Sequence, residues 1–136
     1  FRRVLFRSLD ILESEAIANA AKIGDYMKQR IQTWVDKYEI VGDVRGMGLM
    51  IGIEIVKDKK TKALAGKERD RIVDQLCFER GVLMLGCGET TIRLSPPLII
   101  TKEQADIAMD VLEECIGIVN KETSATPSVP GKQAGA

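Results

Sequence analysis

The sequence contains no histidine, and its 136 residues include only three cysteines, Cys77, Cys87 and Cys115. The lack of histidine excludes a Ser-His-Asp or Cys-His mechanism within this chain, together with the usual mixed zinc sites. Since the cysteine count is odd and no CxxC spacing occurs, a disulfide framework is not expected, and a reducing cytoplasm is the simpler setting. No spaced pair of carboxylates points to a metal or glycosidase site, so we expect no metal.

Neither net charge nor long apolar runs indicate a macromolecular partner. The 20 lysines and arginines balance the 20 aspartates and glutamates, which removes the electrostatic signature of a nucleic-acid-binding protein. The apolar run 48–53 ends at Glu54, far short of the roughly 20 apolar residues of a membrane helix. We therefore expect no nucleic-acid partner and no membrane partner. Aromatic residues are scarce, at 4%, but the hydrophobic total of 45% is ordinary for one globular domain.

The two ends of the chain differ from the rest. Residues 1–8 carry three arginines and do not fit the pattern that follows, so we interpret them as a foreign or truncated end. The first residue is not methionine, which suggests that the chain was cut from something longer. Residues 120–136 have almost nothing to bury and are expected to be a disordered tail. One structured domain, 9–119, remains.

Apolar residues at steps of three and four predict amphipathic helices. Three helices are expected, over 10–38, 67–80 and from 101 onward. Thr101 and Gln104 form a capping box at the start of the third helix, and Gly81 ends the second.

Alternating apolar and polar residues predict strands. Three strands are expected, over 44–56, 82–85 and 91–95, the last two joined by a turn at 86–88. The order helix, strand, helix, strand, strand, helix predicts an α/β (α+β) fold, a small antiparallel sheet covered by helices on one face. The G-x-G sequences at 46–48 and 86–88 lack the further residues of a dinucleotide or phosphate loop, and we interpret both as turns.

Arg93 is the residue best placed to bind a ligand. It alternates with Ile92 and Leu94, so it points to the opposite face of the strand from them. If Ile92 and Leu94 pack under the helices, Arg93 projects from the open face of the sheet. An arginine held on a rigid strand can bind a carboxylate through two hydrogen bonds. An ordinary exposed arginine is the alternative interpretation.

Four segments, in this order and spacing, resemble the C-terminal part of the class III aminotransferases. They are LDILE leading to NAAKIG at 9–24, VRGMGLMIGIE at 44–54, GVL through CG at 81–88, and TIRLSPPLIIT at 91–101. This family includes the 4-aminobutyrate, ornithine and acetylornithine aminotransferases, which are pyridoxal-phosphate enzymes. The resemblance covers about residues 9–118 and does not extend to residues 1–8 or to the tail.

The resemblance implies the small C-terminal domain of a fold-type I enzyme that is usually a homodimer. In the family, a large domain upstream binds pyridoxal 5'-phosphate and carries the Schiff-base lysine. No lysine here falls in a matching motif, so we assign no catalytic and no cofactor-binding residue. The arginine of the family's I-R-L-x-P-P-L segment binds the substrate's carboxylate, and it falls on Arg93.

The function implied is therefore that of a partial enzyme. The parent would move an amino group between an amino acid or omega-amino acid and a 2-oxo acid. This segment would bind the substrate carboxylate, close the site and be inactive alone. A stand-alone amino-acid-binding regulatory module and a purely structural or interaction piece stay open as alternatives. Whether the parent is an aminotransferase, a racemase or an aminomutase also stays open.

Overall fold

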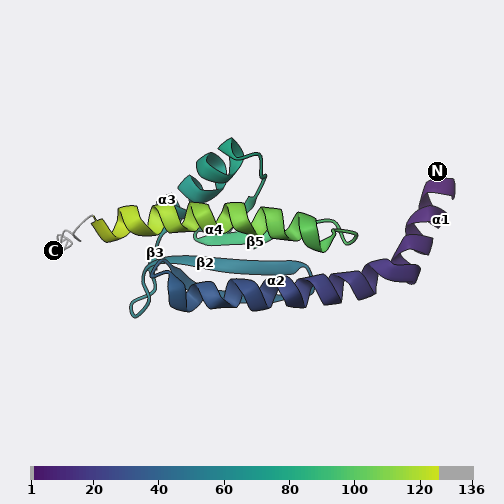
Figure 1. Cartoon of the computed structure of the whole chain (residues 1–136), viewed down its shortest axis with the longest axis horizontal. Coiled ribbons are helices and arrows are strands. Elements are labelled where there is room, and N and C mark those ends of the chain that lie inside the picture. Colours follow the sequence, from purple (N-terminus) through teal and green to yellow (C-terminus); the bar gives the residue numbers. More distant parts are fainter. Residues whose placement is uncertain (1, 126–136) are drawn as a thin grey trace, which may run out of the picture.

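The computed structural model describes residues 2–125 and arranges them as helices packed on an antiparallel sheet (Figure 1). The helical elements are α1 (Arg2–Ile11), the π-helical η1 (Leu12–Ala16), α2 (Ile17–Lys37), α3 (Gly66–Asp70), the π-helical η2 (Arg71–Cys77) and α4 (Lys102–Ala125). The strands are β1 (Val41–Met47), β2 (Met50–Asp58), β3 (Ala63–Leu64), β4 (Leu85–Cys87) and β5 (Thr91–Leu94). Figure 1 shows α1 projecting away from the body of the molecule.

The sheet has the strand order β1-β2-β5-β4, and every pair of neighbours is antiparallel. The short β3 pairs with β2 outside this path. The long connection from β2 to β4 contains α3 and η2, and β5 then inserts between β2 and β4. This arrangement confirms the predicted fold class. It also makes β5, the strand that carries Arg93, an interior strand of the sheet.

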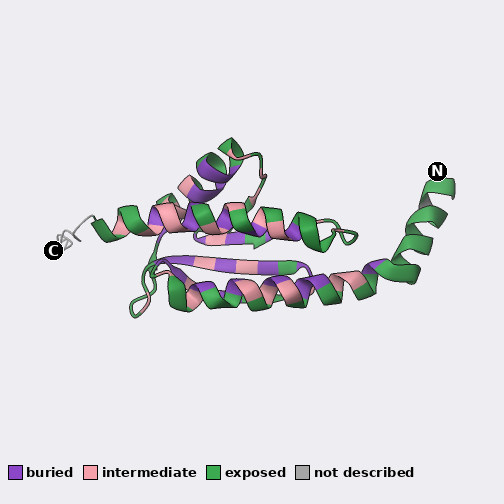
Figure 2. Cartoon of the chain, in the orientation of Figure 1, coloured by how far each residue is buried: buried purple, intermediate pink, exposed green. Residues whose placement is uncertain are grey.

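The hydrophobic core lies between one face of the sheet and the helices (Figure 2). On the sheet side, Ile51, Ile53, Ile55 and Ile92 are all fully buried. The helices contribute a buried stripe from α2 and another from α4, comprising Ile23, Met27, Ile31, Trp34, Ala105, Met109, Leu112, Cys115, Ile116 and Val119. On the opposite face of the sheet the described residues are exposed or half-buried, apart from Val56 near the end of β2, which is buried. The helices therefore cover one face, as predicted.

The single strand predicted over 44–56 is in fact a hairpin. β1 ends at Met47, β2 begins at Met50, and these two residues pair with each other. Gly48 has a φ of +54°, the left-handed conformation that a tight turn needs and that glycine adopts at low cost. The alternation misled the prediction because Leu49, although it lies in the turn, is buried on the same side as Ile51.

Two further boundaries differ from the prediction. Gly86 and Cys87 belong to β4, and the turn follows at 88–90, where Gly88 has a φ of +58°. Helix α4 continues to Ala125, so the disordered tail predicted from residue 120 is wrong for 120–125. Residues 126–136 of that predicted tail lie outside the described residues. Within residues 2–125, no helix is both long enough and apolar enough to span a membrane.

Candidate functional site

Arg93 projects from the open face of the sheet. Its neighbours on β5, Ile92 and Leu94, are 0% and 5% exposed and face the helices, whereas Arg93 itself is exposed. The predicted orientation of its side chain is therefore confirmed. Across the sheet, Arg93 pairs with Gly52 of β2 and with Leu85 of β4, so strands flank it on both sides.

The segment that follows Arg93 is tied to the first long helix. The side-chain amide of Asn19 in α2 donates to the backbone oxygens of Leu98 and Ile100 at 2.7 and 3.0 Å. The amide of Ile100 in turn donates to the oxygen of Pro97 at 3.0 Å. Since Pro97 and its neighbour cannot donate to a sheet ladder, this tether fixes the exit of β5 where regular pairing stops. The sequence did not single out Asn19, because a long-range side-chain contact has no local pattern.

Unlike the five other arginines between residues 30 and 93, Arg93 has no carboxylate partner in the part of the chain that the structure describes. The arginines that form ion pairs with nearby carboxylates are Arg30, Arg45, Arg69, Arg71 and Arg80. Arg45 shares the open face with Arg93 and contacts both Asp43 and Glu54, at 3.0 and 2.6 Å. Within residues 2–125, Arg93 forms no ion pair. A free guanidinium on a fixed strand is available to an external carboxylate.

Several large apolar side chains are exposed on or beside the sheet that carries Arg93. Met47 and Met50 at the β1–β2 turn are 88% and 68% exposed, and Leu85 beside Arg93 is 55% exposed. Leu83, just before β4, is 81% exposed. A patch of this kind on a soluble domain usually marks a surface that meets another domain, a partner or a ligand.

Arg69 also contacts the β4–β5 hairpin, which carries Arg93. Arg69 of α3 directs its Nη2 toward the backbone oxygens of Gly88 and Glu89, at 3.5 and 3.4 Å. A Cβ at residue 86 would lie 1.5 Å from Arg69 Nη1, so a side chain there would displace the end of the Arg69 side chain from this position. Sequence reasoning missed Arg69. The glycine at 86 could have indicated that another side chain packs closely against this position, but we interpreted it as a turn residue.

The surroundings of the described lysines and of Cys77 bear on whether these groups can act as nucleophiles. Every lysine in residues 2–125 is exposed or half-buried, and the half-buried Lys28 and Lys59 donate to the backbone oxygens of Gly46 and Val35 at 3.0 and 2.5 Å. Burial, together with the neighbouring Cys115, raises the pKa of the Cys77 thiol to about 12, so it is not a nucleophile at neutral pH. No cluster of three metal-ligating side chains occurs within the described part of the chain.

Comparisons with known proteins are consistent with the fold described above. The family model described as aminotransferase class-III matches residues 3–116. The chain is 41% identical over 108 residues to an alanine–glyoxylate aminotransferase 2 homologue of Arabidopsis thaliana, covering 77% of this chain and 22% of that protein. It is 38% identical over 112 residues to a leucine/methionine racemase of Thermococcus litoralis, covering 82% of this chain and 25% of that protein. The match begins at residue 3, so it includes most of the end that we expected to fall outside any resemblance.

A solved structure gives the same result in three dimensions. An amine transaminase from an uncultivated Pseudomonas species, in its PLP-bound form, matches 82% of this chain with a TM-score of 0.75 and 37% sequence identity. The match covers 26% of that transaminase. This chain thus spans about a quarter of the length of the proteins that it matches.

Proposed function

This chain belongs to the class-III aminotransferase family, and we propose that it is the part of such an enzyme that binds the substrate's carboxylate. The observation that carries the proposal is the Arg93 guanidinium, which is unpaired within residues 2–125, lies on an interior strand and faces away from the core. Two hydrogen bonds from this group would hold a carboxylate at a fixed distance and orientation. The role of Arg93 is therefore positioning, and bond breaking belongs to groups outside this chain.

The cofactor of the whole enzyme, in this proposal, is pyridoxal 5'-phosphate. When bound, it draws electrons from the bonds of the substrate carbon that carries the amino group. The described residues do not fit a site for it, because none of their lysines is buried and both G-x-G sequences lie in or beside the turns of hairpins. We assign the cofactor to the part of the enzyme outside this chain, so that the chain alone is inactive.

Substrates and assembly are part of the same proposal. The relatives named above act on alanine and glyoxylate or on leucine and methionine, which supports an amino acid as donor and a 2-oxo acid as acceptor. The family resemblance supports a homodimer. The free cysteines Cys77, Cys87 and Cys115 support a reducing, cytoplasmic setting.

The test is an assay of the full-length protein that contains this segment. Purified with pyridoxal 5'-phosphate, it should transfer the amino group of an α-amino acid to a 2-oxo acid such as pyruvate. The 136-residue chain, in the same assay, should neither transfer the group nor show the visible absorbance of bound cofactor. Transfer by the chain alone, or absence of any reaction with the full-length protein, contradicts the proposal.

Racemisation is a second candidate activity, because the racemase relative is 38% identical to this chain. It requires the substrate carboxylate to be held in the same way. It differs in that the amino group stays on its carbon, while the proton of that carbon is removed and returned on the opposite face. Chiral chromatography of a single-enantiomer donor, incubated without a 2-oxo acid, separates the two reactions.

A regulatory module would instead bind amino acids as the isolated chain, which calorimetry with common amino acids would detect.

A further inference from the structure

The position directly opposite Arg93 on β2 carries no side chain. Gly52 pairs with Arg93 on one side and with Arg45 of β1 on the other, so the three residues form a row across the open face. A Cβ at residue 52 would have as its nearest neighbours the Cγ2 of Thr91, at 3.2 Å, and the backbone oxygen and Cγ of Arg45, at 3.8 and 4.0 Å. No atom of Arg93 is among them, and because residue 52 is glycine, no side chain of β2 stands in the space directly beside Arg93.

The other sides of this space are fixed. Arg45 Nη1 donates to Asp43 Oδ2 and Glu54 Oε2 at 3.0 and 2.6 Å, and its Nη2 lies 3.5 Å from Thr91 Oγ1. Two carboxylates therefore hold the Arg45 guanidinium in place and balance its charge. Arg45 and Thr91 form a wall of the space, and Arg93 supplies its free positive charge.

We propose that Gly52 is a specificity-determining residue that keeps this space free for the carboxylate end of an α-amino acid held by Arg93. The inference rests on the proposed function and adds a size limit to it. Side chains directly opposite each other on antiparallel strands have Cβ atoms about 4.5–5.5 Å apart. Any side chain at 52 would therefore stand beside Arg93 and occupy the volume that the bound carboxylate needs.

The test uses two variants of the full-length holoenzyme. Thr91→Ser removes the methyl group that a Cβ at residue 52 would crowd, and it keeps the hydroxyl near Arg45. The double variant Gly52→Ala/Thr91→Ser then differs from it by one methyl group inside the space. We expect KM for α-amino acid donors to rise about 10-fold or more between the two, with kcat changed less. KM for an amine donor without a carboxylate should stay the same.

Equal KM values for α-amino acids in the two variants would overturn the inference while leaving the proposed function intact. Absence of amino transfer and of racemisation by the unaltered holoenzyme would instead overturn both.

If the double variant does not fold, competition by simple carboxylates in the unaltered enzyme gives a second test. Acetate should compete with the amino acid donor at least about 10-fold better than the bulkier trimethylacetate. Equal inhibition by the two would contradict a size limit at Gly52.

Discussion

Two helical glycines, Gly24 and Gly117, differ in what lies around them. A Cβ on Gly24 of α2 would come within 2.2 Å of the backbone of Gly48, where the helix crosses the β1–β2 turn. A Cβ on Gly117 of α4 would meet the Tyr38 ring at 3.6 Å, an ordinary contact distance. The same substitution should therefore have opposite effects at these two positions.

We predict that Gly24→Ala lowers the free energy of unfolding of the chain by about 1–3 kcal/mol, because backbone atoms have to move apart. Gly117→Ala, the matched control, should raise it by about 0.5–1 kcal/mol, because alanine favours the helix. Urea unfolding followed by circular dichroism measures both values. A neutral Gly24→Ala would contradict the close packing of α2 on the turn.

Residue-level prediction from the sequence succeeded for the orientation of Arg93 and failed for its surroundings. Alternation along a strand fixes which side a residue faces, and this is a local property. Among the described residues, Arg93 lacks an ion-pair partner while Arg45 has two, and this difference depends on the register between β1, β2 and β5. Register is set by pairing over long distances in the sequence, which a single sequence does not display.

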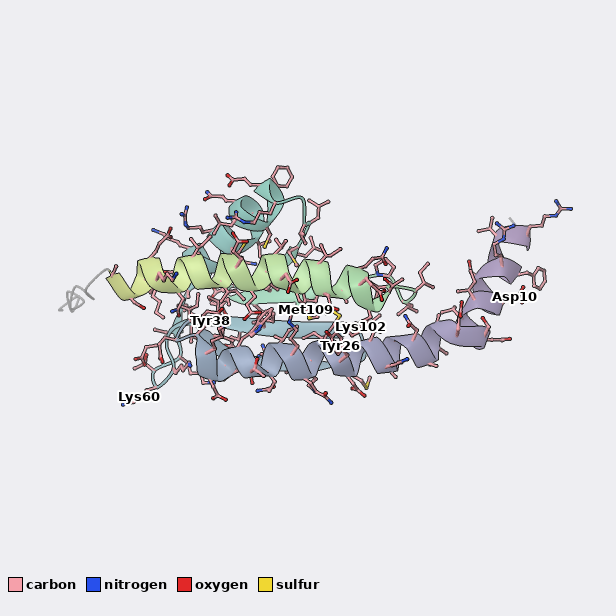
Figure 3. All side chains as sticks on the ribbon, in the orientation of Figure 1. Asp10, Tyr26, Tyr38, Lys60, Lys102 and Met109 are labelled. Carbon is pink, nitrogen blue, oxygen red and sulfur yellow. The ribbon has the colours of Figure 1, made fainter. Side chains whose placement is uncertain are left out.

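Helices α2 and α4 are joined by a cluster of charged and aromatic side chains. Figure 3 labels Tyr26 and Lys102, which come from the two helices and lie next to each other: the Lys102 ammonium is 4.4 Å from the ring centre. Both donate hydrogen bonds to Asp106, Lys102 at 2.7 Å and Tyr26 at 2.5 Å. Arg30 of α2 pairs with Asp106, Asp110 and Glu113 of α4.

These contacts make stability depend on pH in the acidic range. The hydrogen bonds from Lys102 and Tyr26 hold the pKa of Asp106 below its usual range. Burial alone would raise the pKa of Glu113, but hydrogen bonds from Lys37 and Arg30 outweigh it and lower that pKa. The unfolded chain therefore binds protons more readily. The stabilisation is complete above the unfolded pKa values, about 4, and is lost as the pH falls through the lower folded values.

We predict that the urea midpoint of the chain is constant between about pH 6 and 5 and falls below about pH 4. In Lys102→Met, the pKa of Asp106 returns toward its ordinary value, so the fall should be smaller. Lys121→Met, on the same helix at an exposed position without an ion pair among the described residues, should behave like the unaltered chain. Identical acid profiles for all three proteins would contradict the role of Lys102.

The start of α4 supplies a second prediction for a single element. Thr101 Oγ1 accepts a hydrogen bond from the amide of Gln104 at 3.2 Å, and Gln104 Oε1 accepts one from the amide of Thr101 at 3.1 Å. Thr101→Ala should lower the free energy of unfolding by about 0.5–2 kcal/mol. Thr33→Ala, at an exposed position inside α2, serves as the control and should change it by less. Equal effects at the two positions would argue against the cap.

Among the elements, the capping box was predictable and the β1–β2 hairpin was not. A cap depends on two residues three positions apart, and the sequence shows both. The hairpin depends on a two-residue turn within an unbroken alternation, and Leu49 in that turn is as buried as a strand residue would be. The π-helical segments, Leu12–Ala16 and Arg71–Cys77, likewise have no pattern that distinguishes them from an α-helix.

At the scale of the whole molecule, the three cysteines report on the integrity of the fold. Cys77 and Cys115 are fully buried between η2 and α4, and burial raises the pKa of both thiols. Cys87 on β4 is exposed. We predict that a thiol reagent at pH 8 modifies one cysteine of the native chain quickly and all three in urea. Fast modification of all three without denaturant would contradict the packing of η2 on α4.

Family and fold class were both within reach of the sequence, because several separated segments and the order of elements carry them. The ends of the family match and of the last helix were less predictable. The match begins at residue 3, and α4 runs to Ala125. Helix ends are set by packing and solvation of the last turns, which composition describes poorly. The exposure of Met47, Met50, Leu83 and Leu85 is a property of the folded chain and became visible only in the structure.

The central claim, that Arg93 holds the substrate's carboxylate, is tested most directly by donor kinetics of the Arg93→Ala full-length holoenzyme. Losing a desolvated carboxylate contact costs about 2–5 kcal/mol, so kcat/KM for an α-amino acid donor should fall about 30-fold to several thousand-fold. An amine donor without a carboxylate should keep its kcat/KM within about 3-fold. An unchanged kcat/KM for every carboxylate-bearing donor and acceptor would remove Arg93 from the site.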